Sequence, residues 1–284
     1  MSDDHVYLSL AESHEDSDAR WAFGTGFEDP LYGVSTEVPA GVDTGELAAL
    51  CVALGDDALI SAQRLAEWCT RAPELEEEVA LANLGLDLLG QARLLYARAG
   101  QVDGTGRDED AYAYLRSSQE FRNVRLAELP NGDFAFSTAR LLVLSCWRLA
   151  VLAQLAGTAD PVLAAIAAKG VKELTYHRQY AAEWVVRLGD GTALSRARMR
   201  SGLDQVTPYL EELFAASTGN GVDGQAVRED VTARLSEVCQ AATLSLPQAV
   251  PRPQRGRDGD HTEHLTPLLV ELQSVARALP GAVW

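Results

Sequence analysis

From Thr44 to the C-terminus the chain reads as one helical segment after another, and this feature constrains its fold more than any other. Apolar residues recur every three or four positions within each segment, which is the period of an α-helix. Breakers such as Pro73, Gly100 and Pro130 separate the segments, and no alternation of useful length predicts a β-strand. The sequence therefore predicts an all-α bundle of about eight helices. The expected helices are residues 45–70, 73–100, 108–129, 136–156, 161–188, 192–216, 224–243 and 261–279.

The N-terminal part has a different character. Residues 1–44 show weak periodicity and several breakers, among them Pro30, Gly33 and Pro39. Such a segment is expected to form an irregular arm. No linker of domain scale interrupts residues 45–284, so the bundle is expected to be one domain over that range.

The charge balance excludes several classes of partner. Lys and Arg number 24 against 41 Asp and Glu, so the formal net charge is 24 − 41 = −17. So acidic a chain does not favour binding to nucleic acid or to an anionic membrane surface, since both attract clusters of Lys and Arg. No apolar run reaches the roughly 18 residues that a membrane helix needs, and the acidic N-terminus does not resemble a signal peptide.

The cysteines indicate a compartment. None of the four belongs to a CxxC pair, and each lies within a helix-like apolar pattern. We expect buried, reduced thiols, which is typical of a cytoplasmic protein. The four are Cys51, Cys69, Cys146 and Cys239.

A polar stripe runs along the otherwise apolar helix 73–100. Asn83, Asp87 and Gln91 are spaced four residues apart, which places them on one side of the helix. One interpretation is that the stripe faces solvent or a subunit boundary. The other is an internal polar network at the bundle centre, where each buried group must find a partner.

Residues of two other helices could meet this stripe: Asp57, Glu67, Glu173 and His177. Carboxylates and imidazoles that project inward from antiparallel helices resemble the di-iron carboxylate bundles. In those bundles two helices each supply a Glu and two others each supply Glu-x-x-His.

The chain does not meet this requirement. Helix 73–100 has no histidine, and His177 comes one position late after Glu173. We therefore expect neither catalytic nor metal-ligating residues here, and interpret the seven polar residues as a relic cluster. A metal enzyme with an atypical site would instead use Asp57, Glu67, Asp87, Glu173 and His177.

A second pair of histidines lies near the C-terminus. The spacing of His261 and His264 would suit a metal, but no third ligand is close in the sequence. The alternative is a helix N-terminus, capped by Asp260 or Thr262, whose histidines contact a neighbouring element.

Four long segments resemble a known family, the PaaC-type subunits of phenylacetyl-CoA epoxidase, a bacterial multicomponent oxygenase. They are LGDDALISAQRLAEWCTRAPELEEEVALANLGLDLLGQARLLYARAG (54–100), EFRNVRLAELPNGDFAFSTARLL (120–142), KELTYHRQYAAEWVVRLGDGT (172–192) and GRDGDHTEHLTPLLVELQSVARALPGAVW (256–284). The similarity begins at about Gly45 and continues to the C-terminus, leaving the arm uncovered.

The resemblance implies a ferritin-like bundle and a division of labour. In this family a sister subunit is catalytic, carries the di-iron site and binds phenylacetyl-CoA. A reductase subunit with flavin and an iron–sulfur cluster supplies electrons from NADPH, and the complex epoxidises the aromatic ring with dioxygen. The PaaC-type subunit has lost ligands and serves as a structural partner. The resemblance thus implies a chain without a cofactor of its own that scaffolds the catalytic subunit, contacts the reductase in some assemblies and self-associates when alone. A free-standing ferritin-like protein is the alternative.

The relic interpretation makes one specific structural prediction. If the stripe is internal, Asp87 points into the bundle centre and hydrogen-bonds to a group from helix 45–70 or helix 161–188. Its candidate partners are Arg64, Asn83, Gln91 and His177.

Overall fold

The computed structural model describes residues 31–217, 221–280 and 282, and the regular elements of this part of the chain are all helical. The longer helices are α2 (Thr44–Ala66), α3 (Leu75–Val102), α6 (Phe134–Leu155), α7 (Pro161–Gly189), α8 (Ala193–Val206) and α10 (Gly224–Ala241). The shorter ones are α4 (Glu109–Tyr114), α5 (Arg125–Glu128), α9 (Leu210–Ala216), α11 (Leu265–Leu272) and α12 (Ser274–Ala278). The predicted all-α bundle is confirmed.

Helix starts follow from local chemistry. The first N–H groups of a helix have no partner within the helix, and a side-chain oxygen just before it can accept from them. Six helices begin in this way, after Asp43, Asp108, Asp133, Asp160, Thr192 and Asp223. Pro161 then occupies the first turn of α7, where its missing N–H costs nothing.

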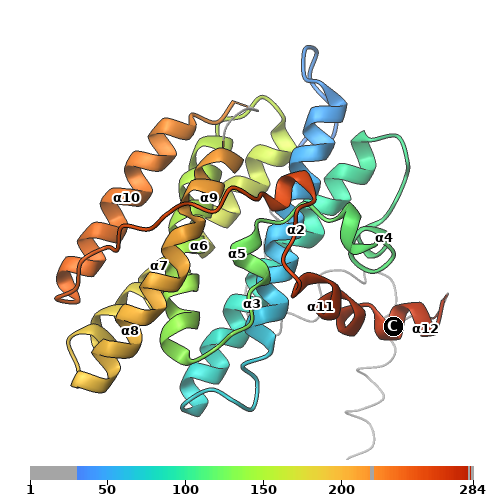
Figure 1. The fold of residues 1–284 in the computed structure, drawn as a ribbon. Coiled ribbons are helices and arrows are strands. Elements are labelled where there is room, and N and C mark those ends of the chain that lie inside the picture. Colours follow the sequence, from blue (N-terminus) through green and yellow to red (C-terminus); the bar gives the residue numbers. More distant parts are fainter. Residues whose placement is uncertain (1–30, 218–220, 281, 283–284) are drawn as a thin grey trace, which may run out of the picture.

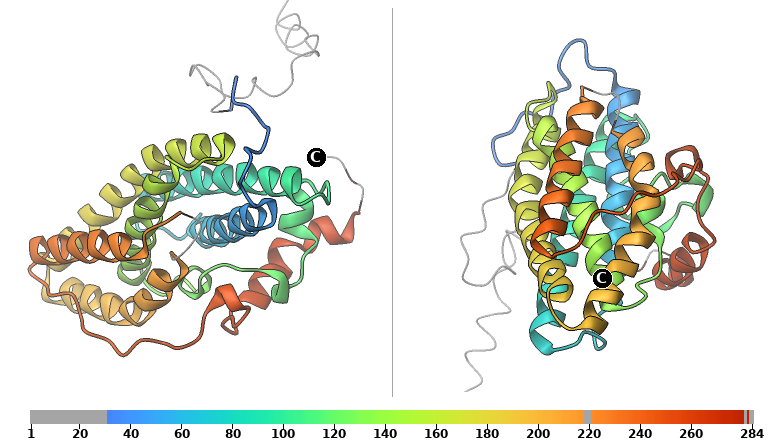
Figure 2. Two further views of the ribbon diagram at one scale, coloured as in Figure 1. Left: turned by 90° about the horizontal axis from the view of Figure 1, so that it is seen from above. Right: turned by 60° about the vertical axis from the view of Figure 1, so that its left-hand side comes forward.

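Four long helices, α2, α3, α6 and α7, form the core of the bundle (Figure 1). Helix α2 pairs with α3 and α6 pairs with α7, while α3 also touches α7; α8 and α10 flank this core on the far side of α6 (Figure 2). Helix α6 is long and apolar enough to cross a membrane, but its most apolar window is entirely buried by other helices. It is the central helix of the bundle, as its uniform apolarity predicts.

The chain after α10 crosses the bundle before it forms α11 and α12. We call residues 244–264 the C-terminal strap; it passes α9 and α5 (Figure 1). Backbone N–H groups of the strap donate to the Pro208 carbonyl over 3.1 Å and to the Glu212 carboxylate over 2.8 Å. The strap thus brings distant sequence against the bundle core.

The segment predicted as helix 108–129 is wrong in its middle, where the chain is extended between η1 (Ser118–Glu120) and α5. Two buried aspartates of α2 cause this difference. The N–H of Arg122 donates to Asp56 over 2.7 Å, and the N–H of Val124 donates to Asp57 over 2.8 Å. Carboxylate acceptors replace the helical carbonyls there, because a buried carboxylate must be hydrogen-bonded.

Other boundaries also differ. Predicted helix 192–216 changes to a 3₁₀ turn at Thr207–Tyr209, which contains Pro208, before α9. Predicted helix 261–279 begins only at Leu265. Residues 31–43 contain no helix, and Arg98 holds them by donating to the Thr36 carbonyl over 2.8 Å. The rest of the predicted arm lies outside the described residues.

The cysteines are free thiols. Cys51, Cys146 and Cys239 are buried as expected, and burial raises the pKa of the Cys51 and Cys146 thiols to about 12. The expectation is wrong for Cys69, which is exposed because α2 ends at Ala66 and the chain turns outward.

Candidate functional site

Asp57 of α2 lies at the buried centre of the bundle, with no solvent exposure. Its main partner is Arg257 of the C-terminal strap, whose two terminal nitrogens lie 3.0 Å and 2.5 Å from the carboxylate oxygens. Arg148 of α6 lies farther away, at 3.7 Å. The carboxylate is therefore compensated by cations from two segments that lie far apart in the sequence.

Arg148 connects the helices of the core. Its guanidinium donates to the carbonyl of Leu54 over 3.1 Å and to the Gln91 side-chain oxygen over 2.9 Å. Gln91 in turn donates to Glu173 of α7 over 2.9 Å, and Lys169 pairs with Glu173. Asp57, Arg148, Gln91 and Glu173, which we call the central network, thus join α2, α6, α3 and α7.

Asp87 and His177 form a separate pair at the edge of this region. The Nε2 atom of His177 lies 3.0 Å from the Asp87 carboxylate, and the histidine side chain is fully buried while that of Asp87 is 38% exposed. Asp87 has therefore found a partner on helix 161–188, as predicted. Its exposure shows that it lies at the rim of the bundle, and the predicted central position is wrong.

The two remaining residues of the predicted cluster lie elsewhere. Asn83 is exposed. Glu67 follows the end of α2, where it pairs with Arg64 over 2.6 Å and accepts from Asn131 over 3.1 Å. The seven residues thus divide into a central group, a rim pair and two outer positions.

The arginines of α6 were missing from the predicted cluster, although the sequence carries a signal for them. Arg140 and Arg148 are the two charged residues of an otherwise apolar helix, and both are buried. Burial lowers the pKa of Arg148 to about 10 and that of Arg140 to about 9, with Arg64 contributing to the latter. A charge on a helix that is apolar all round must be buried with it, and so must meet a partner.

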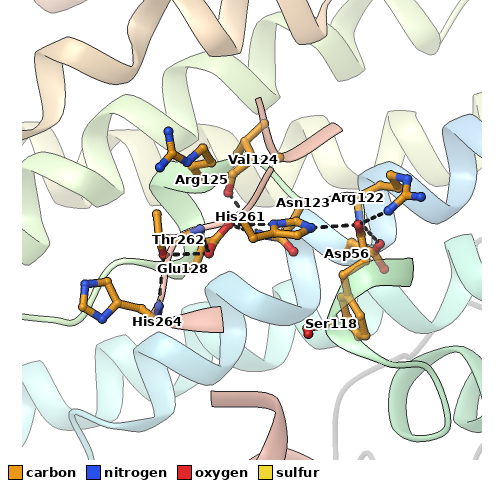
Figure 3. A network of polar contacts seen from close by, with 12 residues as sticks. Asp56, Ser118, Arg122, Asn123, Val124, Arg125, Glu128, His261, Thr262 and His264 are labelled. Carbon is orange, nitrogen blue, oxygen red and sulfur yellow. Dashed lines mark hydrogen bonds and ion pairs between the residues drawn. The ribbon is translucent and has the colours of Figure 1, made fainter. Parts of the chain in front are cut away.

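A second polar network surrounds Glu128 of α5 (Figure 3). Its carboxylate accepts from His261 Nδ1 over 2.8 Å, from the Thr262 N–H over 2.9 Å and from the Thr262 hydroxyl over 2.7 Å. The other ring nitrogen of His261 lies 2.9 Å from the Phe121 carbonyl. Burial lowers the pKa of His261, but these acceptors outweigh burial and raise it, because both face a ring nitrogen that must carry a proton.

This geometry decides between the two interpretations of the C-terminal histidines. Both nitrogens of His261 are occupied by protein acceptors, and the partly exposed His264 has the adjacent Glu263 as its acidic neighbour, at 3.9 Å. The pair does not form a metal site; His261 contacts a neighbouring element instead. The expected capping residue is also wrong, since the residue before α11 is His264 and makes no side-chain cap.

The central network does not fit a di-iron centre. Such a centre needs carboxylates and imidazoles free to ligate. Here Arg257 holds Asp57, an amide occupies position 91, and the guanidinium of Arg148 lies among the acidic groups. Among the described residues, the one carboxylate group close enough to share an ion lies at the solvent-exposed start of α3 (Glu74, Glu76 and Glu77), away from the network.

Comparison with known proteins agrees with this fold. The sequence profile of the family described as "Phenylacetic acid catabolic protein" matches residues 35–284, so the match includes part of the segment expected to lie outside the bundle. The chain is also 41% identical over 247 residues to the PaaC-type subunit of the 1,2-phenylacetyl-CoA epoxidase of Escherichia coli (strain K12). This alignment covers 84% of the chain and 99% of the relative. A family match over most of the chain, together with this identity, shows that the chain belongs to the phenylacetic acid catabolic protein family.

Proposed function

We propose that the chain is a non-catalytic structural subunit of a phenylacetyl-CoA epoxidase in aerobic phenylacetate degradation, and that it scaffolds the di-iron subunit that epoxidises the aromatic ring. The observation that carries this proposal is the guanidinium of Arg148, 1% exposed, which lies between Asp57 and Gln91 where a metal enzyme of this architecture would need free ligands. A fixed organic cation satisfies these groups, so the bundle is stable without chemistry of its own.

The proposal assigns the cofactors to other chains. Di-iron belongs to the catalytic subunit, flavin and the iron–sulfur cluster belong to the reductase, and this chain contributes neither. The complex works in the cytoplasm, which suits the three buried free thiols.

The exposed apolar face of α3 supports a role in assembly. Four large apolar side chains on this helix are 36% to 70% exposed and are spaced by four, seven and three residues: Leu75, Val79, Leu86 and Leu89. Tyr176, on the adjacent helix α7, is 54% exposed. Apolar side chains repeated at helical spacing on a surface mark a protein interface. We assign this stripe to the contact with the catalytic subunit.

Co-expression with the catalytic subunit tests the assignment. We expect the two chains to elute together in size-exclusion chromatography at physiological salt, because permanent interfaces typically bury about 2,000 Å² or more. Leu86→Asp should weaken the complex at least tenfold. Leu194→Asp on α8 is the matched control, since Leu194 is 63% exposed against 60% for Leu86, and should leave the complex unchanged.

Elemental analysis tests the non-catalytic assignment separately. The purified chain should not retain stoichiometric iron. Two irons per chain with an oxygen-sensitive absorption would refute the non-catalytic role. Separate elution of the two subunits would instead favour a free-standing ferritin-like protein.

A further inference from the structure

A small cavity of about 20 Å³ lies beside the central network. Residues from four helices contribute to its wall, including Ser61 of α2, Leu88 of α3, Arg148 of α6 and His177 of α7. A cavity of this size has room for about one water molecule, provided that it offers the polar partners that a buried water needs.

Three polar atoms on this wall have no hydrogen-bond partner among the described residues. They are Ser61 Oγ, Arg148 Nε and His177 Nδ1. Their residues are 8%, 1% and 0% exposed, so bulk solvent does not reach them freely. Buried polar atoms in native proteins are nearly always hydrogen-bonded, and three orphans from three helices on one cavity wall indicate a common partner.

The protons of these groups define that partner. His177 Nε2 faces the Asp87 carboxylate, so it carries the ring proton, and Nδ1 of the neutral ring is an acceptor. Arg148 Nε–H can only donate, while the hydroxyl of Ser61 can do either. The partner must therefore accept from arginine and donate to histidine. A halide cannot donate, and a metal cation would be repelled by the guanidinium.

We propose that this cavity binds a single structural water, which accepts from Arg148 Nε–H, donates to His177 Nδ1 and hydrogen-bonds to Ser61. Three hydrogen bonds are about what a buried water makes. The water connects the central network to the rim pair. A polar path then runs from Asp57 through Arg148, the water and His177 to Asp87. It ties α2, α6 and α7 together and holds His177 in the tautomer that donates to Asp87.

A crystal structure at about 1.6 Å tests the proposal, either of the chain or of its complex with the catalytic subunit. We expect one water peak within about 3.2 Å of all three atoms. Crystals soaked in bromide should show no anomalous peak there. A bromide peak at this position, or no density in reach of the three atoms, would overturn the proposal.

Water-oxygen magnetic relaxation dispersion gives an independent readout in solution. Ser61→Val fills the cavity, so this variant should lose one long-lived internal water relative to the parent. His177→Phe removes the acceptor and should lose the same water by a different route. Ser145→Ala, which removes a hydroxyl from the same wall that is not one of the three orphans, should retain it. Folded Ser61→Val and His177→Phe variants with the parental number of long-lived waters would refute the assignment.

Discussion

The two arginines that face Asp57 should differ in their coupling to it, and distance rather than burial should decide which is stronger. Arg257 comes within 2.5 Å of the carboxylate but is 18% exposed, whereas Arg148 is 1% exposed and lies 3.7 Å away. If burial dominated, Arg148 would be the stronger partner. If contact dominates, Arg257 would be.

The magnitude follows from the distances. At the effective dielectric constant of about 20 that suits protein charge pairs, the interaction at 2.5 Å exceeds that at 3.7 Å by about 2 kcal/mol. Burial also lowers the pKa of Arg148 to about 10, so the fold holds this charge at a cost that offsets part of its attraction. Arg257→Met should therefore cost about 4 kcal/mol by leaving a buried carboxylate poorly compensated. Arg148→Met should cost about 2 kcal/mol, mainly because the Gln91 oxygen loses its donor.

Double-mutant cycles in urea denaturation separate the pairwise energy from these other contributions. Each arginine is changed to Met alone and together with Asp57→Asn, and the urea dependence is checked for constancy so that free energies can be compared. We expect the Arg257–Asp57 coupling to exceed the Arg148–Asp57 coupling by about 2 kcal/mol. Equal couplings, or a stronger one for Arg148, would refute the reasoning. Adding Gln91→Leu to Arg148→Met should recover most of the lost stability, because no unpaired amide oxygen remains.

Three further predictions concern single positions. The raised pKa of His261 contributes stability that is fully present below the unfolded value of about 6.5 and is lost as the pH rises through the folded pKa, so the melting temperature should fall over that range, and less so in His261→Gln. A parent and variant with the same pH profile would show that the contact to Glu128 does not depend on the charge. Gly256→Ala should destabilise by about 3 kcal/mol and expose the strap to protease, since the new Cβ would lie 1.9 Å from the Asn123 carbonyl oxygen; parental stability and protease resistance would contradict this. Asp87→Leu should cost only about 1–2 kcal/mol in urea denaturation, because this carboxylate is 38% exposed; a loss near 4 kcal/mol would mean that Asp87 is buried in solution.

Local sequence determined where the long helices run. The apolar periods of residues 136–156 and 161–188 predicted α6 and α7 to within two residues at each end, and aspartates or threonine before the helices supplied the caps. These signals depend on neighbours three or four positions away in the chain, and they are therefore legible without a structure. The same local logic showed that helix 73–100 lacks the imidazole that a di-iron site requires.

Tertiary structure decided how the polar residues are shared. The stripe at Asn83, Asp87 and Gln91 is regular in sequence, yet one residue faces solvent, one lies at the rim and one is buried. The rotation of α3 against α2 and α7 sets these positions, and the spacing alone does not contain it. Asp57 likewise looked like a partner for the stripe, but its contacts come from Arg257 on the strap and from the backbone of Val124. A buried charge takes whichever compensating group the packing brings nearest, and that group can come from any point along the chain.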